Sequence, residues 1–155
     1  MKILLAFDGS PHSHTALTAV AARPWPPGST IKLLTVIELA FSPMPNTKLL
    51  PDSYYAKFER EVRRAAQEAL HAAAEQLRAN AVTTNLCVLT EIQMGEARQA
   101  ILAEAGRWEA DWIVLGCHGY PGWTKRWLGS VPYSVGLHAP CSVAIVRLAE
   151  NKGSA

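Results

Sequence analysis

Short apolar segments alternate with helix-like segments along the chain, and this alternation restricts the possible folds more than any other feature. Segment 3–7 is apolar at every position, which is typical of a strand buried on both faces of a parallel sheet. Related patterns predict further strands at 31–37, 83–90, 112–115 and 143–146. Strands separated by helices favour parallel pairing through right-handed crossovers. We therefore predict a single-domain, doubly wound α/β fold with a five-stranded parallel sheet and helices on both faces.

Four segments between these strands carry the apolar spacing and the end signals of helices. Ser10 is expected to cap the first helix, with Pro11 as its first residue, and Asp52 or Ser53 to cap the second. The third helix is predicted at 96–108 and the fourth at 131–138. The residues expected to face the sheet are Leu17, Val20, Ala21, Phe58, Val62, Ala65, Ala66, Ala69, Ala73, Leu77, Ile101, Leu102 and Ala105.

Composition and charge exclude several classes of protein. With 155 residues, 49% hydrophobic and 18% charged, the chain has the size and balance of one globular domain. Its 15 basic and 13 acidic residues leave a net charge of only +2, so we expect no nucleic-acid partner. No apolar stretch approaches the roughly 20 residues of a membrane-spanning helix. The three widely spaced cysteines fit reduced thiols in a cytoplasmic protein.

A glycine-rich segment follows the predicted strand 112–115. Gly116, Gly119, Gly122 and the pair Gly129-Ser130 can bring backbone N–H groups close to an anion, because glycine has no Cβ. Ser130 is expected to cap the fourth helix, whose N-terminus would then favour a phosphate. No lysine precedes Ser130, so the segment is not a P-loop of the Walker type. A purely structural strand-to-helix turn is the alternative interpretation.

Asp8 ends the first predicted strand and is the second candidate for binding. A carboxylate at this place could accept hydrogen bonds from the hydroxyls of a ribose. The alternative is a structural aspartate that stabilises the turn into the first helix.

The spacing of Gly116, Gly119 and Gly129-Ser130 resembles the ATP-binding signature of the universal stress protein family. The opening segment 3–10, the central segment 95–101 and the closing segment 138–147 also resemble family segments in the family's order. The similarity thus covers nearly the whole chain, with residues 1–149 as the nucleotide-binding domain and 150–155 as a frayed tail. It implies the strand order 3-2-1-4-5, in which Asp8 and Gly116 face each other at the point where the winding reverses.

The resemblance also implies a ligand and a set of binding residues. The ligand would be ATP or another adenine nucleotide, with or without Mg²⁺. Val36 corresponds to the position whose backbone contacts adenine, and Ala6 to a neighbour of the ribose or base. The cofactor-binding residues expected together are Ala6, Asp8, Val36, Gly116, His118, Gly119, Gly122, Gly129, Ser130 and Val131. The chain departs from the family at Pro132, where many members have Ser or Thr, and this departure predicts weaker phosphate binding.

Other reactive residues have simpler explanations. Cys117 and His118 are adjacent, but sequence neighbours rarely point at each other as a nucleophile and its base must. His12 and His14 are interpreted as surface residues in preference to a metal pair, and Asp111 as the end of the third helix. No catalytic residue is assigned, and a metal site is left open.

The function predicted from these features is that of a nucleotide-binding regulator in the stress response. Any ATP hydrolysis should be slow, because the recognisable loops supply no acidic metal ligand besides Asp8. A slow nucleotide hydrolase on the same scaffold and a nucleotide-free dimerisation module are the alternatives. A homodimer is expected through the last strand, Ser142–Arg147, because exposed sheet edges invite pairing and family members dimerise there.

Overall fold

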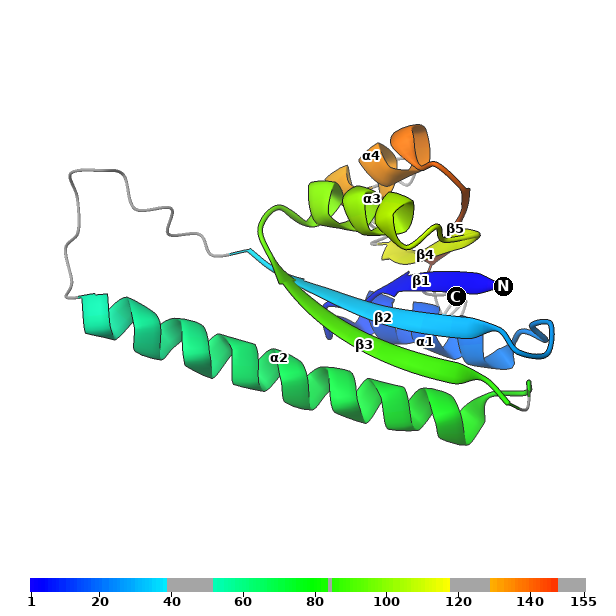
Figure 1. Ribbon diagram of the computed structural model, residues 1–155, viewed down its shortest axis with the longest axis horizontal. Helices are drawn as coiled ribbons and strands as arrows, with labels where there is room; N and C mark the ends of the chain where they lie inside the picture. Colours follow the sequence, from blue (N-terminus) through cyan, green and yellow to red (C-terminus); the bar gives the residue numbers. More distant parts are fainter. Residues whose placement is uncertain (39–51, 84, 118–128, 148–155) are drawn as a thin grey trace, which may run out of the picture.

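The computed structural model describes residues 1–38, 52–83, 85–117 and 129–147, and the account below concerns these ranges. Five strands form one parallel sheet in the order β3-β2-β1-β4-β5, which confirms the predicted fold class and strand order (Figure 1). The strands are β1 (Lys2–Ala6), β2 (Thr30–Ile37), β3 (Cys87–Met94), β4 (Trp112–Cys117) and β5 (Ser142–Arg147). The helices are α1 (Pro11–Ala22), α2 (Asp52–Asn80), α3 (Ala97–Arg107) and α4 (Ser130–His138).

Two apolar clusters, one on each face of the sheet, hold these layers together. Ile3 and Leu5 of β1 belong to the cluster beneath α1 and α2, whereas Leu4 belongs to the cluster beneath α3 and α4. Figure 1 shows the two pairs of helices on opposite sides of the strands. The continuous apolar run of β1 is therefore explained by burial on both faces, as the sequence predicts.

The ends of α1 and α3 agree with their sequence signals, whereas the predicted caps of α2 and α4 do not. The Ser10 hydroxyl caps α1 by accepting the Ser13 backbone N–H at 3.2 Å, and Pro11 is the first helical residue. In α3 the ends Glu96 and Trp108 are the flanking cap residues. The N-cap of α4 is Gly129, without a side-chain cap, so the prediction that Ser130 caps this helix is wrong. Ser130 is instead its first residue.

The third strand lies four residues further along the chain than the predicted segment 83–90. Residues Cys87 to Met94 pair in register with β2, from Thr30 to Ile37. The segment before β3 is tied to the end of α1 instead: the Val82 N–H donates to the Ala21 carbonyl, and the Thr83 hydroxyl accepts the Trp25 N–H. The second half of β3 carries Glu91 and Gln93, whose polarity hides the strand in the sequence.

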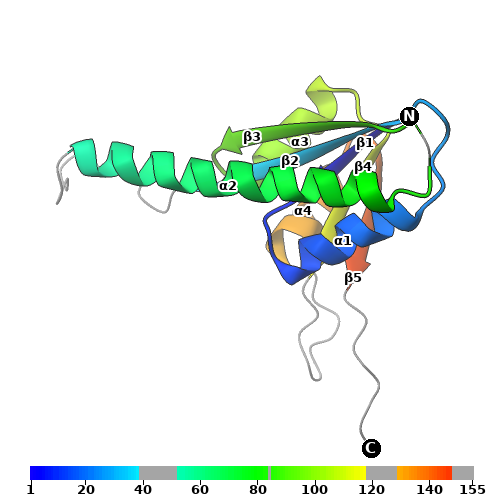
Figure 2. The same cartoon turned by 90° about the horizontal axis from the view of Figure 1, so that it is seen from below.

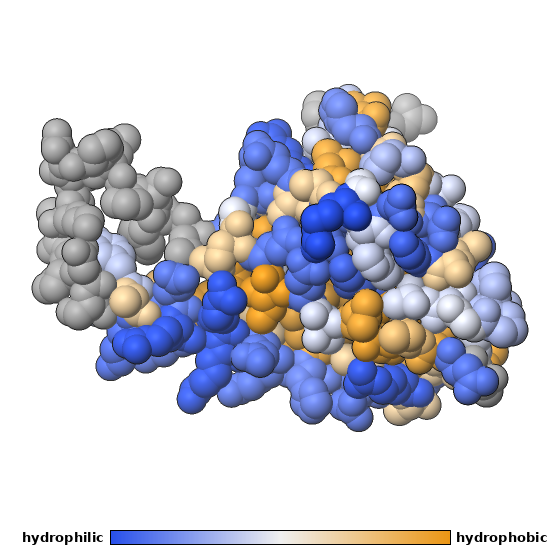
Figure 3. Space-filling view, viewed as in Figure 1, coloured by the Kyte–Doolittle hydropathy of each residue, from blue (hydrophilic) through white to orange (hydrophobic). Residues whose placement is uncertain are grey.

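Only the C-terminal half of α2 packs on the sheet. Its buried residues are Leu70, Ala73, Ala74 and Leu77, whereas Phe58 is 40% exposed and Ala65 and Ala69 are exposed. The prediction that the whole apolar stripe faces inward is therefore wrong for the first half. Figure 2 shows this half projecting beyond the strands, and Figure 3 shows mostly hydrophilic side chains along its visible face. The helix begins at Asp52, so neither Asp52 nor Ser53 precedes it as a cap.

A partly buried cluster of charges joins α3 to the sheet; Glu104 and Lys32 are buried, whereas the Arg107 side chain is largely exposed. Glu104 of α3 is 1% exposed, and its Oε1 lies 2.6 Å from Nζ of Lys32 in β2, which is 7% exposed. The other carboxylate oxygen accepts from Arg107 and from Gln93. Glu91 of β3 accepts from both Lys32 and Arg107. Two positive and two negative charges therefore balance, as buried ions require. None of the helices in the described ranges is long and apolar enough to cross a membrane.

Candidate functional site

A cavity of about 260 Å³ lies where the carboxyl ends of β1, β2 and β4 meet the N-termini of α1, α3 and α4. Open α/β sheets bind ligands at this place, where the winding of the chain reverses. Seven predicted binding residues line the cavity: Ala6, Asp8, Val36, Gly116, Gly129, Ser130 and Val131. The remaining three, His118, Gly119 and Gly122, lie outside the described residues, as do Trp123 and Trp127.

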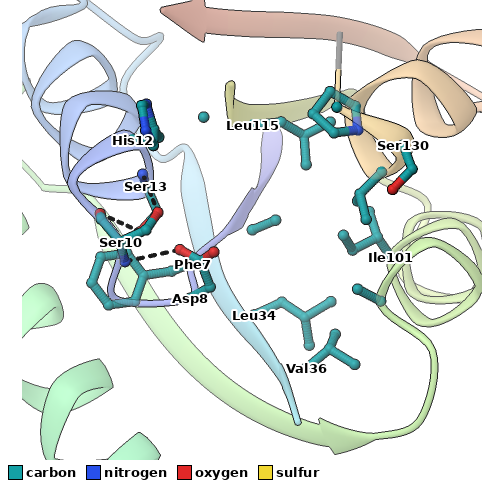
Figure 4. A pocket seen from close by; sticks show the side chains of 16 residues that line it. Phe7, Asp8, Ser10, His12, Ser13, Leu34, Val36, Ile101, Leu115 and Ser130 are labelled. Atoms are coloured by element: carbon teal, nitrogen blue, oxygen red, sulfur yellow. Dashed lines mark hydrogen bonds between the residues drawn. The ribbon is translucent and has the colours of Figure 1, made fainter. Parts of the chain in front are cut away.

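The cavity has a polar and an apolar side (Figure 4). Asp8, Ser10 and Ser13 lie together where β1 turns into α1, whereas Leu34, Val36 and Ile101 lie across the cavity from them. Sequence reasoning missed most of the apolar wall. Its members Leu34, Ala97, Ile101 and Leu115 carry no signal that separates them from ordinary core residues.

The first turn of α1 contributes more residues to the cavity wall than the sequence indicates. Ser10, His12 and Ser13 all line the cavity, and the Ser10–Ser13 spacing of an N-cap was the one signal available. The interpretation of both histidines as surface residues is wrong for His12, which is half-buried in the cavity wall. His14 is exposed and packs edge-on against Phe7, with ring centroids 5.0 Å apart.

Asp8 combines the structural and the binding roles considered for it. Its Oδ1 accepts the Ser10 backbone N–H at 2.9 Å, which forms the turn into α1, and the residue also lines the cavity. Partial burial alone would raise the pKa of this carboxyl, but hydrogen bonds from Ser10 and Ser13 outweigh that effect and hold the pKa below its ordinary value of 3.8. Asp8 is therefore a carboxylate at neutral pH, a group that accepts hydrogen bonds and donates none.

Gly116 is a glycine because of helix packing. A Cβ at this position would lie 2.3 Å from the carbonyl oxygen of His12 and 2.7 Å from the backbone nitrogen of Ser13. The backbone of α1 thus occupies the space that any other side chain would need. The prediction of this glycine for anion approach alone overlooked that packing requirement.

Gly129 differs from Gly116 in the space around the position of a Cβ. Its φ is −55°, which any residue adopts, and a Cβ would meet only Cδ of Pro132, at 3.6 Å. Neither the fold nor the backbone conformation requires glycine here. Absence of a side chain at the N-terminus of α4 leaves room beside the cavity, where Ser130 and Pro132 also lie.

The remaining reactive residues do not form a second site. Cys117 is buried at the end of β4, and no disulfide joins Cys87, Cys117 and Cys141. Asp111 does not end α3, because this helix stops at Arg107. The carboxylate of Asp111 instead accepts the backbone N–H of Lys2 at 2.7 Å and so joins the start of β4 to β1. Within the described part of the chain, no group of three or more His, Cys, Asp or Glu residues could hold a metal ion.

Three solved structures share this fold. A universal stress protein UspA from Lactobacillus plantarum has a TM-score of 0.73 at 22% identity, and the match covers 95% of this chain and 97% of that one. A universal stress protein in complex with cAMP has a TM-score of 0.65 at 20% identity, covering 95% and 96%. A family protein from Arabidopsis thaliana with AMP bound has a TM-score of 0.64 at 14% identity, covering 98% and 94%.

Sequence comparison gives the same relationship. The model of the universal stress protein family matches residues 1–147. A universal stress protein of Thermus aquaticus, encoded in the QAH/OAS sulfhydrylase 3′ region, is 32% identical over 145 residues, which are 94% of this chain and 97% of the relative. The chain therefore belongs to the universal stress protein family.

Proposed function

We propose that the cavity binds an adenine nucleotide and that residues 1–149 act as a nucleotide-responsive regulator in the stress response. One observation carries this proposal: residues from three distant segments, selected as nucleotide ligands from the sequence, line one cavity. The structural neighbours solved with cAMP and with AMP support the choice of an adenine nucleotide. ATP is the ligand we favour, because the resemblance that selected these residues is to an ATP-binding signature.

The two sides of the cavity suit the two ends of a nucleotide. Leu34, Val36 and Ile101 offer an apolar surface to a base, and the Asp8 carboxylate can accept hydrogen bonds from ribose hydroxyls. The phosphates would lie at the N-terminus of α4, against Gly129 and the Ser130 hydroxyl, where backbone N–H groups and the helix dipole favour negative charge.

The proposed orientation can be tested with two substitutions at opposite ends of the ligand. Asp8→Ala should weaken adenosine, AMP and ATP alike, by about 1–3 kcal/mol for the lost hydrogen bonds to an ionised group. Ser130→Ala should weaken ATP more than adenosine, because it removes a phosphate contact. Isothermal titration of the three ligands measures both effects. Equal losses of adenosine affinity in the two variants would refute this orientation.

A second measurement separates the regulator from its alternatives. We expect adenine nucleotide to co-purify with the protein from cells and to be found by mass spectrometry, whereas a nucleotide-free dimerisation module would carry none. A steady-state turnover assay should detect at most slow ATP hydrolysis; rapid turnover would instead identify a hydrolase. Three cysteines without a disulfide agree with the reducing cytoplasm that we propose as the location of this regulator.

A further inference from the structure

The N-terminus of α3 is capped from another part of the chain. Its N-cap residue, Glu96, makes no side-chain cap hydrogen bond. The carboxylate of Glu38 takes that place: its Oε1 accepts the backbone N–H of Ala97, the first residue of α3, at 2.6 Å. Glu38 directly follows β2, so this hydrogen bond joins two elements whose residues are 59 apart in the sequence.

The elements joined by Glu38 form the apolar side of the cavity. Val36 lies two residues before Glu38 on β2, and Ala97 and Ile101 lie one turn apart on α3; all three line the cavity. Near the other end of α3, the ion pair between Glu104 and Lys32 ties the same helix to the same strand. The separation of Val36 from Ala97 is therefore fixed from both sides, with Glu38 at the end nearest the cavity.

Glu38 also makes the three helix N-termini around the cavity electrically unequal. Carboxylates already lie at two of these N-termini, because Glu38 accepts the first N–H of α3 and Asp8 accepts the N–H of Ser10, the N-cap residue of α1, whereas α4 has no side-chain cap. A negatively charged ligand group is repelled by the Glu38 carboxylate at α3 and meets no such charge at α4. The base end of a nucleotide is consequently the end that suits the α3 side.

We propose that Glu38 is a positioning residue for the nucleobase: it holds α3 at the distance from β2 that admits a flat apolar group, and it keeps phosphate away from that side. This inference rests on the proposed binding of an adenine nucleotide. Glu38 does not itself line the cavity, so it acts through Val36, Ala97 and Ile101.

The test compares two fragments of the ligand, adenosine and inorganic triphosphate. Glu38→Ala should weaken adenosine about tenfold, the effect of losing one hydrogen bond to a charged group, and should not weaken inorganic triphosphate. Glu38→Gln should keep adenosine affinity within about twofold, because an amide oxygen still accepts the Ala97 N–H. A general loss of stability would weaken both fragments, so equal losses would overturn the proposal.

Glu96→Ala is the matched control. It removes a carboxylate from the same end of α3 without removing a cap hydrogen bond, since Glu96 contacts Gln99 and Arg98 instead. Its adenosine affinity should remain close to that of the wild type. A loss as large as that of Glu38→Ala would show that charge alone matters and would overturn the positioning role.

Hydrogen exchange separates this inference from the proposed function. In the ligand-free protein, the Ala97 amide should exchange at least about tenfold faster in Glu38→Ala than in the wild type or Glu96→Ala, because its hydrogen bond is lost. Unchanged exchange would overturn the role of Glu38 whatever the protein binds. Wild-type protein that binds neither adenosine nor ATP would refute the proposed function and, with it, the role of Glu38 in placing the base, whatever the exchange of Ala97.

Discussion

Some residues at the cavity are required by the packing of the fold, and others are placed to contact a ligand. Gly116 and Gly129 were selected together from one glycine pattern, yet a Cβ at Gly116 would collide with the backbone of α1 and a Cβ at Gly129 would not. Asp8 accepts hydrogen bonds in a turn and still faces the cavity. The chemical type of a residue therefore does not separate its structural role from its proposed ligand role, and substitutions are needed to do so.

Gly116→Ala should destabilise the protein by about 1–3 kcal/mol, because the new methyl group must displace the helix backbone 2.3 Å away. Urea unfolding measures this change. Gly136→Ala in α4 is the control: its Cβ would lie 3.9 Å from Cδ1 of Ile145, and alanine is the better helix former, so stability should not fall. An unchanged unfolding free energy for Gly116→Ala would contradict the packing explanation.

Gly129→Val should impair ATP binding and leave the stability of the fold unchanged, in contrast to Gly116→Ala. The fold should survive, since the backbone at Gly129 suits any residue, but ATP binding should be lost because the added side chain fills the space beside the α4 N-terminus. Unfolding and isothermal titration of the same preparation check the two halves of this prediction. Normal ATP affinity in this variant would mean that phosphate does not bind at Gly129.

The lowered pKa of Asp8 predicts how its contribution varies with pH. A carboxyl whose pKa is lower in the folded state stabilises the fold above its unfolded pKa, here near 3.8, and this stabilisation disappears as pH falls through the folded value. The difference in unfolding free energy between wild type and Asp8→Ala should therefore be constant from about pH 5 to 8 and shrink in stronger acid. Urea unfolding across this range provides the measurement. A difference that already changes between pH 6 and 7 would show that another group titrates.

Among the elements, α3 depends most on polar contacts with the sheet. Burial alone would raise the pKa of Glu91, but the hydrogen bonds and charges of Gln93, Lys32 and Arg107 outweigh that effect and lower it. Arg107 likewise has its pKa raised by Glu104 and Glu91. This cluster of charges beneath α3 explains why the predicted segment 83–90 ends before β3 does. Strands are recognised by their apolar residues, but β3 carries Glu91 and Gln93, which bind the charged residues that attach α3 to the sheet.

Glu104→Ala should cost about 3 kcal/mol or more, because it leaves Lys32 buried without its shortest ion pair. The double variant Lys32→Met/Glu104→Leu should be less destabilised than Glu104→Ala, since apolar side chains replace the buried pair and no charge is left unmatched in its place. Urea unfolding of the single and double variants gives both values. If the destabilisation of the double variant equalled the sum of those of Lys32→Met and Glu104→Leu, the two side chains would not interact.

At the scale of the whole molecule, the sheet has two different edges. The strand β3 lies beside α2 along one edge, and β5 forms the other, as expected from the sequence. Residues Val143 to Val146 of β5 are only half-buried within the single chain, so an apolar strand with one unpaired side remains. Such an edge can pair with the same strand of a second copy about a twofold axis, which closes the assembly at two subunits.

We therefore expect a homodimer through β5. Replacing Ala144 and Val146 together by lysine should place two charges at this edge and yield a monomer, or insoluble protein if folding needs the partner. Leu89→Lys is the control, because Leu89 is 40% exposed on the opposite edge strand and should leave the assembly unchanged. Sedimentation equilibrium decides the question, and a wild-type protein that stays monomeric at micromolar concentration would rule this interface out.

Nearly all helices and strands, and their succession along the chain, are predictable from the sequence, because apolar runs, N-caps and prolines are local signals. Together with the family resemblance, which alone indicated Ala6 and Val36, the sequence also marked seven residues of the cavity. Four features emerge only from the folded chain: the register of β3, the exposed first half of α2, the need for glycine at position 116 and the cap that Glu38 provides to α3. Each of these depends on a contact between residues far apart in the chain, and such a contact leaves no pattern in the sequence around either partner.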